Sequence, residues 1–240
     1  TLVNRQAMLV NVTASGTTRA ATEKSIATFL ARLPATTWSP HRRILPPAPH
    51  APEGLLIPAQ VNYVGKSVNL YQLQRPITGH DLVVNRYLRT AWLWDQVRVQ
   101  GGAYGAFGIL DPRAGQCTMT SYRDPNTERT LATYDRTPEF LRALSLDDAE
   151  LTRAIVGTIG DLDGYLLPDA KGFIAMGRHL AGDTDAIRQT TRDQVLATTA
   201  GHFAVYAASL DLLARHGSVV MMGAREKLGS HPGITLIPVL

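Results

Sequence analysis

Short segments in which apolar residues alternate with polar or β-branched ones predict the strands of this chain. Single strands are expected at Met8 to Thr13, Leu55 to Val64, Val219 to Met222 and Ile234 to Val239. Two more, Ala103 to Leu110 and Gln116 to Tyr122, flank a turn that contains proline and glycine at residues 111–115. Such a turn between two strands predicts a β-hairpin.

Longer segments carry their apolar residues on one helical face and predict helices. They are Ala20 to Leu33, His80 to Val97, Thr127 to Leu144, Leu146 to Leu162, and Asp185 to Ala214 with an interruption near Ala200. Residues 15–18 supply a turn and a cap for the first helix, and Ser145 or Asp147 caps the fourth. The pattern at residues 166–182 does not indicate which secondary structure this segment forms.

Residues 34–54 interrupt this pattern with six prolines and are expected to form a loop or linker. The segment before it is too short to fold alone, so we predict one domain over residues 1–240. Strands separated by helices, with a hairpin between them, favour an α+β fold. We expect a mainly antiparallel sheet with helices packed on one face.

Composition narrows the possible functions. Hydrophobic residues make up 45% of the 240 residues, which predicts a packed core. The formal net charge is +4, but Lys and Arg do not cluster, so we expect no nucleic-acid partner. No apolar stretch reaches the roughly 20 residues that span a bilayer, so no membrane partner is expected. The start at Thr1 suggests a processed chain or a piece of a longer one.

The chain shows no complete catalytic set. Its seven histidines form neither H-E-x-x-H nor H-x-x-E-H, and the nearest miss, at His50 to Gly54, contains a proline that excludes a helix interior. We therefore expect no metal ligands. Cys117 is the single cysteine, which excludes an internal disulfide, and it is expected to be a small buried residue. The glycines near residue 101 lack the Lys and Ser/Thr of a phosphate-binding loop.

One segment carries candidate chemistry: Arg98 follows an apolar helix, and Tyr104 begins a strand after two glycines. One interpretation is an ordinary helix-to-strand connection, in which Arg98 bonds the last helix carbonyls and Tyr104 packs at the sheet edge. The other is a peptide-binding site, because a guanidinium and a phenol can both donate to a carbonyl oxygen or an oxyanion. Gly101, Gly102 and Ala103 would leave room for an extended substrate beside the strand.

The same segment resembles the carboxy-terminal half of presequence proteases, which are pitrilysin-like, inverted-motif zinc metallopeptidases that degrade free peptides. The resemblance rests on Trp92 to Asp95 followed by Val97-Arg98-Val99-Gln100-Gly101-Gly102-Ala103-Tyr104-Gly105. Ordered matches extend it over about residues 55–205, at Gln60 to Lys66, Asp111 to Arg113, Ser121 to Asn126, Ile159 to Asp163 and Pro168 to Gly172. No role is carried over to Asp161, Asp163, Asp169 or Lys171, for which capping, ion pairing or fold maintenance is expected.

The resemblance implies a metallohydrolase domain of the mitochondrial-processing-peptidase type. It implies that Arg98 and Tyr104 complete an active site whose zinc and general base belong to an amino-terminal half that this chain lacks. The expected function is therefore the substrate-binding part of a zinc metalloendopeptidase that degrades unfolded peptides, inactive by itself. The expected partners are that zinc-bearing half and the peptides. The compartment would be the cytoplasm in a bacterium or an organelle matrix in a eukaryote. Two alternatives stay open: a non-catalytic subunit or scaffold of the same fold that partners a zinc-bearing chain, and an independent peptide-binding module.

Overall fold

The computed structural model describes residues 3–39 and 51–239, and its contacts divide the chain into two compact units. Unit 1 comprises Thr1–Pro47 and Gly164–Asp185, and unit 2 comprises Ala48–Asp163 and Ala186–Leu240. The prediction of one domain over residues 1–240 stays a prediction. The predicted loop at 34–54 includes residues 40–50, which lie outside the described residues, and its last two residues, Glu53 and Gly54, begin a strand.

Unit 2 is built on one six-stranded sheet with the order β3-β4-β2-β5-β1-β6. The strands are β1 (Glu53–Leu56), β2 (Asn62–Asn69), β3 (Gly105–Asp111), β4 (Gln116–Asp124), β5 (Ser218–Gly223) and β6 (Thr235–Pro238). The predicted hairpin is confirmed as β3 and β4. The expected strand from Leu55 to Val64 is wrong as one element: it is split into β1 and β2, because Pro58 has no amide hydrogen to continue a ladder.

The sheet is mixed, which corrects the expectation of a mainly antiparallel one. The pairs β3–β4, β2–β4 and β2–β5 are antiparallel, but β1 pairs in parallel with both β5 and β6. The short helix α9 (Arg225–Leu228) connects β5 to β6. Parallel strands need such a crossover, because a tight turn would reverse the chain direction.

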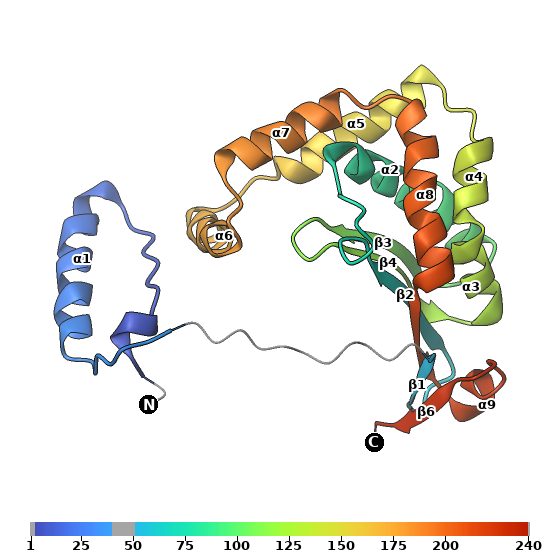
Figure 1. The fold of residues 1–240 in the computed structure, drawn as a ribbon, viewed down its shortest axis with the longest axis horizontal. Helices are drawn as coiled ribbons and strands as arrows, with labels where there is room; N and C mark the ends of the chain where they lie inside the picture. Colours follow the sequence, from blue (N-terminus) through green and yellow to red (C-terminus); the bar gives the residue numbers. More distant parts are fainter. Residues whose placement is uncertain (1–2, 40–50, 240) are drawn as a thin grey trace. The chain divides into compact units, whose positions relative to one another are not determined.

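Four helices lie on one face of this sheet, as Figure 1 shows: α2 (Gly79–Thr90), α3 (Glu128–Asp135), α4 (Thr137–Ala143) and α8 (Gly201–His216). The core between helices and sheet includes Leu88, Met119, Tyr134, Tyr206 and Leu210, each no more than 1% exposed. Even-numbered β2 residues face this core and odd-numbered ones the opposite face, which follows the two-residue period of a strand. The expected α+β fold with helices on one face is confirmed.

Two further helices of this region follow the sequence pattern, whereas one predicted helix does so only in part. Helix α5 (Asp148–Leu162) begins with a capping box in which Asp147, not Ser145, is the N-cap and Glu150 the reciprocal partner. Helix α7 (Asp185–Leu196) ends before α8 begins at Gly201, which confirms the predicted interruption near Ala200. The predicted helix from His80 to Val97 is regular only to Thr90 and continues as the π-helical segment η2 (Trp94–Val99).

Unit 1 contains the 3₁₀ turn η1 (Arg5–Ala7), helix α1 (Gly16–Ala31) and helix α6 (Pro168–Ala181). Ser15 is the N-cap of α1, although its side chain makes no capping hydrogen bond. The expected strand from Met8 to Thr13 is wrong, since these residues are irregular. Alternation alone does not make a strand, because a strand also needs a neighbour for its backbone groups. Within the described ranges, no helix is long and apolar enough to cross a membrane.

Candidate functional site

Arg98 lies on η2, where its guanidinium carbon sits 3.8 Å from the centroid of the Trp94 ring. This cation–π contact fixes the side chain without neutralising its charge. In the described part of the chain, Arg98 has no carboxylate partner, and the neighbouring Asp95 side chain accepts from Gln96 and Gln100 instead. Arg98 therefore keeps guanidinium donors for a further acceptor.

Residues 101–103 form a tight connection from η2 to β3. The Gly102 amide donates to the Arg98 carbonyl at 2.9 Å, and the Ala103 amide donates to the Val97 carbonyl at 3.1 Å. Gly102 has a φ of +79°, which favours glycine, and a Cβ on Gly101 would lie 2.4 Å from the Val97 oxygen. The glycines are thus required by the chain's own backbone. Ala103 is buried at 3% exposure.

Tyr104 projects from the end of this connection and is 68% exposed. Its ring meets Tyr122 edge-on at 5.8 Å between centroids, and Tyr122 meets Tyr63 in the same way at 5.4 Å. The Tyr104 amide donates to the Tyr122 carbonyl at 3.1 Å, which ties its backbone to β4. The Tyr104 hydroxyl has no hydrogen-bond partner among residues 3–39 and 51–239, so it is available to a ligand.

A buried polar network that the sequence analysis missed supports this connection. Asp124, 0% exposed, accepts from the Asn126 amide at 2.8 Å and from the Thr130 hydroxyl at 2.7 Å. Asn126 in turn donates from Nδ2 to the Gly101 carbonyl at 2.6 Å. The signal was present as an Asp-Pro-Asn-Thr run, which is typical of a side-chain-stabilised turn.

The strand β4 bends beside this network. The register between β2 and β4 shifts between Asn62 and Val64, and Arg123 has a φ of 50°, unusual for a residue with a side chain. A bulge of this kind redirects side chains and is often found next to functional sites. It places Tyr122 beside Tyr104.

Other chemistry-bearing residues do not join this site. Burial raises the pKa of the Cys117 thiol to about 11, and Cys117 is 1% exposed, as expected of a packed residue. Asp161 pairs with Arg86, and a hydrogen bond from Arg192 lowers the pKa of Asp163. No group of three or more His, Cys, Asp or Glu that could hold a metal occurs within the described ranges, outside which His41 and His50 lie.

The fold resembles those of solved peptidase structures. A peptidase M16 inactive domain from Pseudomonas fluorescens aligns with 86% of this chain and 51% of its own, with a TM-score of 0.59 and 19% identity. Pitrilysin aligns with 94% of this chain and 25% of its own, also with a TM-score of 0.59, at 13% identity. At these identities the likeness shows that the fold is that of the M16 peptidase domains.

Sequence comparison makes the assignment more specific. The family model for the C-terminal domain of PreP matches residues 52–225, and the chain therefore belongs to the presequence-protease C-terminal-domain family. Presequence protease 1 of Arabidopsis thaliana, named as chloroplastic/mitochondrial, is 42% identical over 233 residues. That match covers 95% of this chain but 21% of the relative, so the chain spans only a small part of its length.

Proposed function

We propose that this chain is the carboxy-terminal, substrate-binding part of a zinc metalloendopeptidase that degrades unfolded peptides. In this proposal Arg98 and Tyr104 reach the peptide bond that is cleaved. The single observation that supports it most is that one short connection carries two unused donors: a guanidinium with no carboxylate partner among the described residues, and a phenol that is 68% exposed.

The chemistry proposed for both residues is electrostatic. A peptide carbonyl gains negative charge on its oxygen as water adds to its carbon, and nearby donors stabilise that charge most when they are already in place. Trp94 holds the guanidinium of Arg98, and the β4 carbonyl of Tyr122 holds the backbone of Tyr104. Gly101, Gly102 and Ala103 contribute to substrate binding by setting the path of the chain between the two donors.

Zinc would activate the attacking water in the parent enzyme. The described residues do not offer a set of ligands for it, so the proposal assigns the metal and the general base to an amino-terminal half of the parent. That half and unfolded peptides are the proposed partners. We propose an organelle matrix as the compartment if the source is eukaryotic, since the Arabidopsis relative is named as chloroplastic/mitochondrial, and the cytoplasm if it is bacterial.

Turnover of an unstructured peptide by the full-length parent tests this function. Arg98→Ala and Tyr104→Phe are each expected to lower kcat by about 100-fold to 1,000-fold, the usual cost of one oxyanion donor. Matched controls are Arg153→Ala and Tyr165→Phe, which change exposed residues outside the site and should leave kcat unchanged. Unchanged turnover in both site variants would refute the catalytic role of Arg98 and Tyr104.

A further inference from the structure

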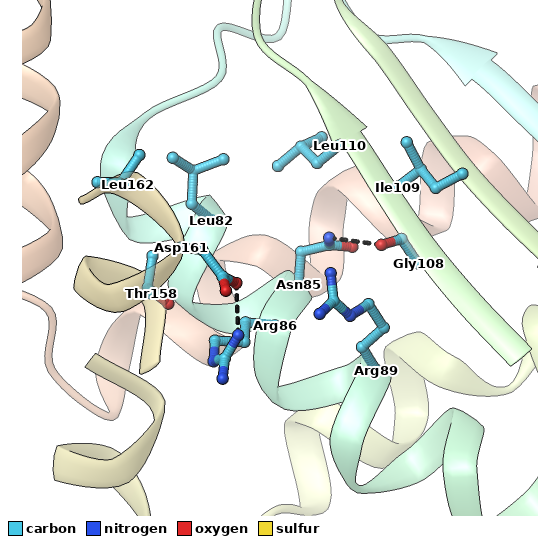
Figure 2. A pocket seen from close by; sticks show the side chains of 10 residues that line it. All are labelled: Leu82, Asn85, Arg86, Arg89, Gly108, Ile109, Leu110, Thr158, Asp161 and Leu162. Carbon is cyan, nitrogen blue, oxygen red and sulfur yellow. Dashed lines mark hydrogen bonds and ion pairs between the residues drawn. The ribbon is translucent and has the colours of Figure 1, made fainter. Parts of the chain in front are cut away.

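A second candidate site lies in unit 2, and its lining includes neither Arg98 nor Tyr104. A cavity of about 250 Å³ opens between α2, α5 and the strand β3 (Figure 2). Helix α2 contributes Leu82, Asn85, Arg86 and Arg89, while β3 contributes Gly108–Leu110. Thr158, Asp161 and Leu162 of α5 form the opposite wall.

The charge of this cavity favours an anion. Asp161 is already paired with Arg86, so the two charges offset each other. Arg89 is exposed, and within the described ranges it has no ion pair or hydrogen bond. Figure 2 shows its side chain extending toward Asn85 and β3. One uncompensated guanidinium remains, and a guanidinium binds a carboxylate through two parallel hydrogen bonds.

The polar groups of the cavity favour a peptide main chain as the carrier of that carboxylate. β3 is the outermost strand of the sheet, and the outer edge of such a strand presents backbone donors and acceptors. Asn85 already uses this edge, because its Nδ2 donates to the Gly108 carbonyl at 2.9 Å. Its Oδ1 accepts no hydrogen bond from the described residues, so it can accept one from a peptide amide.

Apart from Thr158, the remaining lining is apolar, and the volume is small. Leu82 and Leu110 are half-buried, and Leu162 is 41% exposed. Drug-sized ligands occupy pockets of about 300–1,000 Å³, so a cavity of about 250 Å³ suits one residue rather than a longer stretch. A terminal residue brings an apolar side chain, an amide and a carboxylate together in that space.

We propose that this cavity binds the C-terminal residue of a peptide, with its free carboxylate on Arg89. The apolar side chain packs against the leucines, and the last amide donates to Asn85 Oδ1. Capture of a terminal carboxylate is an established mode of peptide recognition. The inference rests on the proposed peptide binding of this chain, but it does not require Arg98 or Tyr104 to act in catalysis.

Fluorescence anisotropy with two labelled peptides tests the inference on the 240-residue chain. Both peptides share one unstructured sequence without acidic side chains and end in leucine, one as the free acid and the other as the amide. The free acid is expected to bind about threefold to fivefold more tightly, the range of an exposed ion pair. Arg89→Ala should abolish the preference and Arg89→Lys should keep part of it, while the control Arg153→Ala should keep it in full. Leu162→Glu, a change at an exposed position, should abolish the preference, because the added carboxylate offsets the charge of Arg89.

The outcomes separate this inference from the proposed function. Equal binding of acid and amide by the unchanged chain, or a preference that survives in Arg89→Ala, would overturn the C-terminal site alone. Failure of both peptides to bind the chain would count against its proposed peptide binding as well. A preference of the same size for an amidated peptide with one internal aspartate would show that the cavity takes a side-chain carboxylate, which contradicts the terminal assignment.

Discussion

The backbone between Arg98 and Tyr104 requires glycine at positions 101 and 102, and alanine substitutions at these positions test that requirement. An alanine Cβ at Gly101 would lie 2.4 Å from the Val97 carbonyl oxygen, and that oxygen also accepts the Ala103 amide at 3.1 Å. The Val97 carbonyl must therefore move to make room for the Cβ, and this movement weakens its hydrogen bond with the Ala103 amide. We expect Gly101→Ala to cost about 2–3 kcal/mol of unfolding free energy, as overpacking does.

Gly102→Ala should cost less, although its backbone is the more unusual. A Cβ there would meet only the Pro125 ring carbon, at 3.5 Å, so the cost comes from the left-handed φ of +79°. That conformation costs about 1–2 kcal/mol for a residue with a Cβ. The loss of glycine freedom in the unfolded chain offsets about 0.4–1 kcal/mol of it. The net cost is expected to be about 0–1.6 kcal/mol.

Urea unfolding followed by circular dichroism measures both costs. Gly160→Ala is the control: it lies in helix α5, has nothing within 4 Å of the new Cβ, and should stabilise the chain by about 0.5–1 kcal/mol. The urea concentration at the unfolding midpoint should decrease in the order Gly160→Ala, unchanged chain, Gly102→Ala, Gly101→Ala. The account of the connection is refuted if Gly101→Ala is as stable as the unchanged chain, or if Gly102→Ala is the less stable variant.

Three further predictions concern buried or titrating groups. Asp124→Ala removes the acceptor of three hydrogen bonds from a fully buried position, and should lower the unfolding free energy by about 3 kcal/mol; a loss below about 1 kcal/mol would contradict the network. Burial and the stacked His202 ring lower the pKa of His80 below 6.5, so the unfolded chain binds more protons there. Stability should therefore fall as pH drops through 6.5, and His80→Asn should flatten that dependence in pH-dependent thermal melts. Burial raises the pKa of the Cys117 thiol to about 11, and its sulfur lies 3.6 Å from the Tyr206 hydroxyl. Cys117 should therefore react with a thiol reagent at pH 8 only as the chain unfolds, and rapid reaction of the folded chain would contradict its burial.

The elements that the sequence predicted correctly are those set by local signals. The hairpin turn at residues 111–115, the capping box at Asp147 and the break near Ala200 each depend on residues a few positions apart. The parallel pairing of β1 with β5 joins residues more than 150 positions apart, and no local pattern encodes it. The expected strand at Met8 to Thr13 failed for the related reason that alternation does not supply a partner strand.

The candidate site, like the fold, was predicted from the sequence only in part. Composition alone favoured an ordinary connection for Arg98 and Tyr104, and the family resemblance was needed to assign them a role in function. The assignment of the glycines to substrate space was incomplete, because the structure shows that the Val97 carbonyl requires the absence of a Cβ at Gly101. The roles of Asp124 and Asn126 were not predicted, because the turn that they form has a local signal but the hydrogen bond from Asn126 to Gly101 joins residues 25 positions apart.

The kinetics of Tyr104→Phe in the full-length parent test the central claim most directly, because the change removes one hydroxyl from an exposed ring and leaves its packing on Tyr122 intact. If the hydroxyl stabilises charge that develops only during the reaction, kcat falls about 100-fold or more while KM for an unstructured peptide changes less than about threefold. An unchanged kcat, or a rise in KM alone, would contradict the claim that Tyr104 acts on the reacting bond.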